Sequence, residues 1–241
     1  MKIDFSKKTE QELLSLSKAA DDVLETLRLM GKAETNTVER VIEHHGTFYE
    51  MDHYPPGDVL DEETASQYYY HAHRPESGEH GHFHTFLRAG AIPDDMSPYP
   101  YEGEEELPLG EDAICHLVAI SMDAQGLPTE LFTTNRWVTG ETFYSAKDTI
   151  KLLDKFKIDH VYPCLGTNQW LTAMLKLFRP QIEQLLIERD QRIESYKKEN
   201  PKTDVFEDED LEVTSIVQID IDEQISAIDK ELEKRKISMV G

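Results

Sequence analysis

The sequence contains very little cysteine. Cys115 and Cys164 are the only two among 241 residues, and they form no Cys-x-x-Cys pair. Two isolated thiols cannot build a zinc-ribbon site, and in a chain without a secretion signal we expect both to be reduced. Metal-binding chemistry, if the chain has any, must therefore depend on its ten histidines and its carboxylates.

Basic residues are also scarce. The chain has 25 lysines and arginines against 48 aspartates and glutamates, which gives a formal net charge of −23. A surface this acidic repels phosphate backbones and anionic lipid, and no cluster of lysine or arginine offsets it. We therefore expect neither nucleic acid nor a membrane as a partner. The same charge attracts cations, metal ions included.

Long hydrophobic runs are missing as well. The first eighteen residues contain no apolar stretch of signal-peptide length, and no window approaches the roughly 20 apolar residues of a membrane span. Hydrophobic residues make up 39% of the chain and charged residues 30%, which suits a globular protein with a sizeable core. We expect a cytoplasmic location.

Several segments have apolar residues spaced by threes and fours, the pattern of an amphipathic helix. The first two cover residues 8–31 and 35–44. A long helix is predicted from residue 166 to about 200, and Pro180 should kink or split it because proline lacks the amide hydrogen and clashes with the preceding turn. Asp220 can cap a last helix. A short helix is also expected over 146–156.

Five other segments are rich in β-branched and aromatic residues and end at turn residues, which predicts strands. They are 47–54, 66–74, 81–88, 114–122 and 130–138. The proline-rich and acidic segment 89–111 reads as a long loop, of a length that is common in lids and binding segments.

These elements predict one α+β domain over residues 1–241, in which helices pack against an antiparallel meander sheet of about five strands. Residues 1–45 form a helical lead-in, residues 46–140 the sheet with a histidine-rich hairpin, and residues 141–241 a mostly helical part.

The histidine-rich hairpin is the most informative stretch, because residues 71–84 hold five of the ten histidines. His71 and His73 are two residues apart, and so are His80, His82 and His84. Side chains alternate between the faces of an extended chain, so each set should point one way. The polar run between the sets contains Pro75 and Gly78 and suits a reversing loop.

We expect an antiparallel pairing in which His73 lies opposite His82, His71 opposite His84, and Tyr69 opposite Phe86. Directly opposed residues share a face with Cβ atoms about 5 Å apart. This pairing would gather four imidazoles on one patch, whereas a slip of one residue would separate the two sets.

Such a patch predicts a bound transition-metal ion, zinc, iron or copper, since imidazole is a preferred ligand of all three. A catalytic site commonly has three protein ligands and one open position. The alternative is a solvated hairpin whose histidines bond only to water and neighbours. The candidate ligands are His71, His73, His82, His84, His80 and His116.

Three further residues are candidates for catalysis. Glu79, or else Glu76, can supply a carboxylate from the loop between the histidine sets. Arg136 can clamp an anion, although an arginine that only packs on an edge strand is the ordinary alternative. Glu141 can act as a general base, although a surface carboxylate is the ordinary alternative.

The segment His80-Gly81-His82-Phe83-His84-Thr85-Phe86 resembles the histidine-triad motif. That resemblance implies nucleotidyl hydrolysis or transfer through a phosphoramidate on His82. Gly81 and Thr85 depart from the motif, which has hydrophobic residues at those places.

Residues 71–88 and 131–141 resemble an uncharacterised bacterial family, and this resemblance implies no mechanism. Three functions remain open. The chain can be a metal-dependent enzyme (a hydrolase or a non-haem oxidoreductase) acting on a small molecule, a histidine-triad-like nucleotidyl transferase, or a non-catalytic protein that handles metal or mediates an interaction. A histidine cluster lying flat on an open surface would favour the last.

Overall fold

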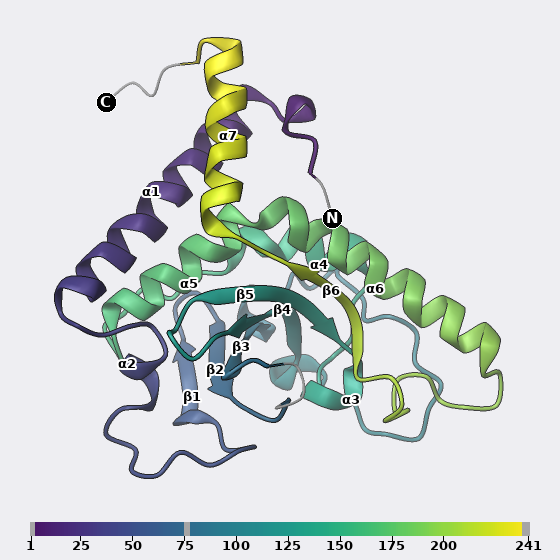
Figure 1. Cartoon of the computed structure of the whole chain (residues 1–241). Coiled ribbons are helices and arrows are strands. Elements are labelled where there is room, and N and C mark those ends of the chain that lie inside the picture. The colour runs from purple at the N-terminus through teal and green to yellow at the C-terminus, as the bar shows by residue number, and fades with distance from the viewer. Residues whose placement is uncertain (1–2, 75–77, 238–241) are drawn as a thin grey trace.

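The computed structural model describes residues 3–74 and 78–237, which form an α+β fold. Six strands make one open antiparallel sheet in the order β1-β2-β3-β4-β5-β6, and helices pack against it (Figure 1). The strands are β1 (Tyr54–Asp61), β2 (Ser66–His71), β3 (Gly81–Arg88), β4 (Ile114–Met122), β5 (Pro128–Thr134) and β6 (Val213–Gln218). The helices are α1 (Glu10–Lys32), α2 (Glu39–Ile42), α3 (Arg136–Thr139), α4 (Ala146–Leu152), α5 (Leu165–Leu177), α6 (Arg179–Glu199) and α7 (Ile221–Arg235).

The meander topology is confirmed, but three details of the strand prediction are wrong, one of which is that Arg136–Thr139 form helix α3 and not the end of a strand. The strand expected over 47–54 is instead β1, which begins at Tyr54 and runs through Pro55 and Pro56. Proline can occupy β1 because it is an edge strand, where an absent amide hydrogen can face solvent. A further difference is β6, a sixth strand that was not among the five predicted ones.

The helix predictions are largely confirmed. Thr9 and Glu12 form a capping box at the start of α1. The long helix is divided into α5 and α6, and Pro180 lies in the first turn of α6, where its missing amide hydrogen costs little. Asp220 caps α7 by accepting from the Glu223 amide. Only α2 is much shorter than the predicted helix over 35–44.

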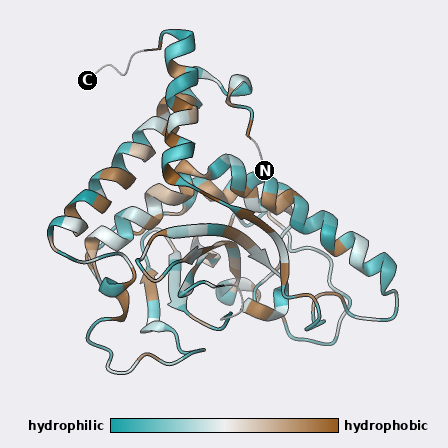
Figure 2. Ribbon diagram, viewed as in Figure 1, coloured by the Kyte–Doolittle hydropathy of each residue, from teal (hydrophilic) through white to brown (hydrophobic). Residues whose placement is uncertain are grey.

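The sheet packs one face against the helices. Tyr68, Tyr70 and Phe83 point to this face, and all three are fully buried. The Phe83 ring lies 6.0 Å from the ring of Trp170 in α5. Figure 1 shows α5 and α6 crossing the sheet, with α1 and α7 farther out. Brown and teal alternate along α1 and α6 in Figure 2, as expected for helices with one apolar side. Across the described residues, no helix has the length and apolarity to cross a membrane.

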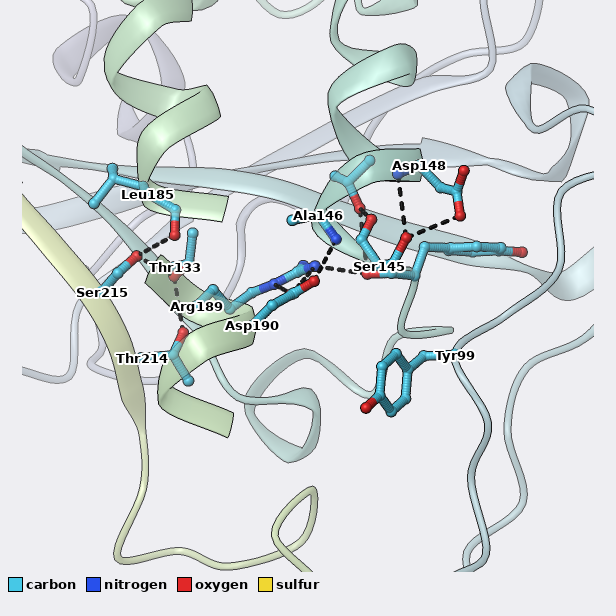
Figure 3. Close-up of polar contacts among 12 residues, drawn as sticks. Tyr99, Thr133, Ser145, Ala146, Asp148, Leu185, Arg189, Asp190, Thr214 and Ser215 are labelled. Carbon is cyan, nitrogen blue, oxygen red and sulfur yellow. Dashed lines mark hydrogen bonds and ion pairs between the residues drawn. The ribbon is translucent and has the colours of Figure 1, made fainter. Parts of the chain in front are cut away.

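Helix α6 is fixed to the sheet and to α4 by polar contacts (Figure 3). The guanidinium of Arg189, which is almost wholly buried, lies 2.9 Å from Asp190. Asp190 also accepts from the Ala146 amide at the start of α4, at 2.6 Å. Nearer the start of α6, the Ser215 hydroxyl of β6 donates to the Leu185 carbonyl at 2.9 Å. Buried polar groups are thus paired where helix and sheet meet, which fixes the position of the sheet.

The contact between β2 and α5 generates a stability prediction. The Tyr68 hydroxyl donates to Asn168 Oδ1 at 2.7 Å within the core. Tyr68→Phe leaves that oxygen buried without its partner, so we expect the free energy of unfolding to fall by about 1–3 kcal/mol. Urea unfolding at fixed pH measures the change. The control is Tyr49→Phe, because Tyr49 is 61% exposed. Equal stability of the two variants would contradict the expectation.

Candidate metal centre

The histidines lie on the face of the sheet opposite the main helix contacts, and their strand pairing differs from the predicted one. His71 lies opposite His82, and Tyr69 lies opposite His84. The expected pairing of His73 with His82 is therefore wrong by two residues. Because side chains alternate with a period of two, a shift of two keeps both sets on one face, and the histidines still meet.

Gly81 explains why β3 can approach β2 in this pairing. A Cβ atom at position 81 would lie 2.6 Å from the carbonyl oxygen of His71 and 2.6 Å from the hydroxyl oxygen of Tyr70. Every other residue would collide with these atoms, so only glycine fits. The glycine that departs from the histidine-triad motif is thus the residue that lets His82 come to face His71.

A β-bulge brings His116 to the same face. Thr85 pairs with Val118, but Phe86 pairs with His116, so β4 contains one extra residue at this point. The bulge reverses the alternation of β4 and turns His116 toward the side of His84. The Nε2 atom of His116 lies 3.0 Å from Nδ1 of His84. No pattern in the sequence marks this bulge.

His71, His73 and His82 form the tightest group, which we call the triad. One ring nitrogen from each residue lies within 4.8 Å of those of the other two. The Nε2 atoms of His71 and His82 are 2.8 Å apart, and the centroid of the His73 ring lies 4.8 Å and 5.0 Å from the other two. His71 and His82 are buried, whereas His73 is half-buried. Three imidazoles this close could bind a metal ion.

Glu79 orients one member of the triad. Its carboxylate lies 2.7 Å from Nδ1 of His82. The carboxylate accepts the Nδ1 hydrogen, so the lone pair of His82 is on Nε2, the atom that faces His71. Burial raises the pKa of Glu79, but the hydrogen bond with His82, together with the Ser121 hydroxyl and the nearby charge of Arg74, outweighs it, and that pKa lies below its ordinary value. Glu79 is therefore an ionised carboxylate next to the triad.

Burial keeps the clustered histidines neutral. It lowers the pKa of His71 to about 2 and that of His116 to about 3. It also lowers the pKa of His84 well below the ordinary value, and neighbouring imidazoles add to the effect. Burial lowers the pKa of His82 too, although the bond with Glu79 opposes the shift. Neutral imidazole is the form that binds metal ions.

The other candidate ligands lie at different distances from the triad. The rings of His84 and His82 are 4.8 Å apart, but His84 and His116 do not belong to the group of mutually close nitrogens. His80 lies elsewhere. Its Nδ1 is 2.6 Å from the Tyr70 hydroxyl, on the helix side of β2. His80 precedes β3, which begins at Gly81, so the alternation of side chains along the strand does not apply to it.

The candidate catalytic residues Arg136 and Glu141 are not members of the triad. Arg136 lies in the short helix α3, not in a strand as expected, and pairs with Glu207. Glu141 is fully buried and not on the surface. Its Oε2 accepts from the backbone amide of His116 at 2.7 Å. Burial raises the pKa of Glu141 to about 7, although the charge of Arg189 opposes the rise. Glu76 lies outside the described residues.

The expected lid is held in place by its neighbours in the fold. Within segment 89–111, the Tyr99 amide donates to the Phe143 carbonyl at 2.8 Å. The Pro108 carbonyl accepts from the Thr142 hydroxyl. Both contacts tie the segment to the residues after α3.

Residues far apart in the sequence border the triad, and sequence reasoning missed them. Nδ1 of His73 lies 3.9 Å from a carboxylate oxygen of Glu212, which precedes β6. The guanidinium of Arg74 lies 4.5 Å from the centre of the Phe132 ring in β5. These contacts join the end of β2 to β5 and β6, and Figure 1 shows β5 and β6 curving over the sheet.

Comparison with known proteins identifies a family but no characterised relative. A family model described as "Domain of unknown function (DUF6969)" matches residues 17–219. No curated protein and no solved structure matches the chain. Any functional conclusion must therefore come from the geometry of the histidine face.

The neutral histidines generate a prediction about pH. Unfolded histidines titrate near pH 6.5, whereas His71, His82, His84 and His116 stay neutral in the folded chain to lower pH. Below about pH 6.5 the unfolded chain therefore binds more protons. The free energy of unfolding is highest above that pH. It falls as the pH decreases, by up to about 1.4 kcal/mol per pH unit for each histidine.

Urea unfolding of chelator-treated protein between pH 8 and pH 5 measures this loss. The control is His44→Asn. The side chain of His44 is 85% exposed, so this substitution should leave the pH profile unchanged. Most carboxylates titrate roughly two units lower than histidine and do not mimic the effect in this range. The exception is Glu141, whose pKa is raised to about 7: it gains a proton in the folded chain and offsets the loss from one of the four histidines. A flat profile between pH 7 and pH 5 would rule out the buried neutral cluster.

Proposed function

The chain belongs to the DUF6969 family, and we propose that it binds one transition-metal ion through His71, His73 and His82. The observation that carries the proposal is that three imidazole nitrogens lie within 4.8 Å of one another, two of them from buried side chains. Three neutral nitrogen ligands suit zinc, iron or copper better than the oxygen-seeking calcium or magnesium. The orientation of His82 by Glu79 supports the proposal, since ligand histidines commonly donate their second nitrogen to a carboxylate.

For His71 and His82, the distance between the ring nitrogens requires only a small adjustment for an ion to bind, whereas a ring nitrogen of His73 lies within 4.8 Å of both. Two imidazole nitrogens bound to one tetrahedral zinc ion lie about 3.3 Å apart, given Zn–N bonds of about 2.0–2.1 Å. The Nε2 atoms of His71 and His82 are 2.8 Å apart. Because Glu79 holds the proton of His82 on Nδ1, the hydrogen between the two Nε2 atoms belongs to His71. Binding therefore displaces that hydrogen and separates the rings by about half an ångström.

Three protein ligands leave a coordination position for water or a small molecule, as in catalytic zinc sites. This open position and the burial of His71 and His82 favour a metal-dependent enzyme over a protein that passes its ion to a partner. The nucleotidyl-transfer alternative receives no support from the geometry. His82, its proposed nucleophile, has one ring nitrogen engaged by Glu79 and the other by His71.

The proposal predicts near-stoichiometric metal in protein purified without chelator, measured by elemental analysis. His73→Ala removes one ligand from the most exposed position of the triad, so it should reduce metal content severalfold or more while leaving the fold intact. The matched control is His80→Ala, which removes a histidine of the same hairpin that contacts Tyr70 instead. Metal-free wild-type protein that also fails to bind added zinc, iron or copper would refute the proposal.

Glu79→Gln tests the orienting carboxylate. Glutamine can still accept from His82 but has no charge, so the affinity for the ion should fall about 10–100-fold. Competition with a chromophoric chelator measures the affinity. Glu62→Gln, at an exposed position of the β1–β2 turn, controls for the loss of one negative charge. An unchanged affinity in Glu79→Gln would show that Glu79 does not support the ligand.

A further inference from the structure

His84 lies beside the triad without belonging to it. Its ring centroid is 4.8 Å from that of His82 and 5.1 Å from that of His71. The side chain is fully buried. Among residues 3–74 and 78–237, its Nε2 atom has no hydrogen-bond partner. A buried polar atom without a partner is unfavourable and indicates that a water, an ion or a ligand meets it.

The hydrogen bond on the other side of the ring shows where Nε2 points. Nδ1 of His84 faces Nε2 of His116 on β4, at 3.0 Å. The two nitrogens of an imidazole point in widely diverging directions. A ring whose Nδ1 faces β4 therefore turns Nε2 away from β4. On that side of β3 lies β2, the strand that carries His71.

The same hydrogen bonds allow an arrangement of hydrogens in which Nε2 of His84 carries none. Nδ1 of His116 is 3.4 Å from the Thr134 hydroxyl, which can accept as well as donate. If His116 donates to Thr134, its Nε2 accepts from His84, and Nε2 of His84 presents a lone pair. A water bound to a metal ion is a strong donor and a poor acceptor, because its lone pair is directed at the ion. A metal-bound water next to His84 would therefore favour the tautomer in which Nε2 presents a lone pair.

We propose that Nε2 of His84 accepts a hydrogen bond from the molecule bound at the open position of the metal ion. This inference rests on the proposed metal site. A nitrogen in this role lies farther from the ion than a ligand does, by up to one hydrogen-bond length of about 2.8 Å. That separation agrees with the exclusion of His84 from the group of mutually close nitrogens. His84 is thus a specificity-determining residue.

The lone pair of His84 defines a class of ligand. It favours molecules that present a hydrogen on or next to the coordinated atom, such as water, a peroxide or hydrogencarbonate. It disfavours anions that can only accept, such as acetate. The rings of Tyr69, Phe86 and Phe132 lie 5.1, 6.1 and 6.1 Å from that of His84, so the ligand is small.

Cobalt(II) provides the test, because its visible spectrum reports both binding and coordination number. Full-length protein loaded with cobalt is titrated with hydrogencarbonate and with acetate at one fixed pH. We expect the wild-type protein to bind hydrogencarbonate about tenfold more tightly than acetate, the value of one hydrogen bond of about 1.4 kcal/mol. His84→Phe should abolish this preference and change the cobalt affinity by less than a few-fold.

Two further variants complete the experiment. His84→Leu, which is closer in volume to histidine, replaces His84→Phe if the larger ring prevents folding as judged by circular dichroism. His80→Phe should retain the full preference, because His80 lies away from the triad.

The outcomes separate the inference from the proposed function. A wild-type protein that binds no cobalt overturns both. If cobalt binds but hydrogencarbonate and acetate bind equally, or if the preference survives in the His84 variants, the inference alone is wrong. A cobalt affinity that falls more than a hundredfold in the His84 variants, with a change of coordination number, would make His84 a ligand and also overturn the inference.

Discussion

The hydrogen bond between Glu79 and His82 determines the state of the histidine cluster. An ionised carboxylate buried beside neutral imidazoles holds the hydrogen of His82 on Nδ1, and thereby directs the Nε2 lone pair toward His71. Without that bond, either nitrogen of His82 could carry the hydrogen. The guanidinium of Arg74 lies 3.7 Å from the second carboxylate oxygen, so the buried negative charge of Glu79 is paired within the protein.

The sheet supplies the geometry that this chemistry needs. Strands place His71, His82 and His84 on one face by simple alternation, and the glycine at position 81 lets the two strands pair where these side chains meet. A bulge in β4 adds His116. The long helices α5 and α6 pack on the opposite face of the sheet. The fold thus separates a hydrophobic core on one face from a polar centre on the other.

The sequence patterns predicted the parts of this structure that depend on the periodicity of apolar residues and on helix-capping residues. They gave the meander, the division of the long helix at Pro180, the cap at Asp220 and the gathering of the histidines. They could not give the pairing of β2 with β3, because a shift of two residues leaves every side chain on the same face. Nor could they give the bulge at His116 or the contact between His73 and Glu212, since both arise from tertiary packing.

Crystallographic anomalous scattering tests the central claim, metal binding by the triad, most directly. Crystals of protein purified without chelator are measured on both sides of the absorption edge of the metal that elemental analysis identifies. If the triad binds the ion, we expect one strong difference peak about 2.0–2.2 Å from a ring nitrogen of each of His71, His73 and His82. A peak at surface carboxylates alone, or hydrogen-bonded histidines with no peak after soaking with zinc, would contradict it.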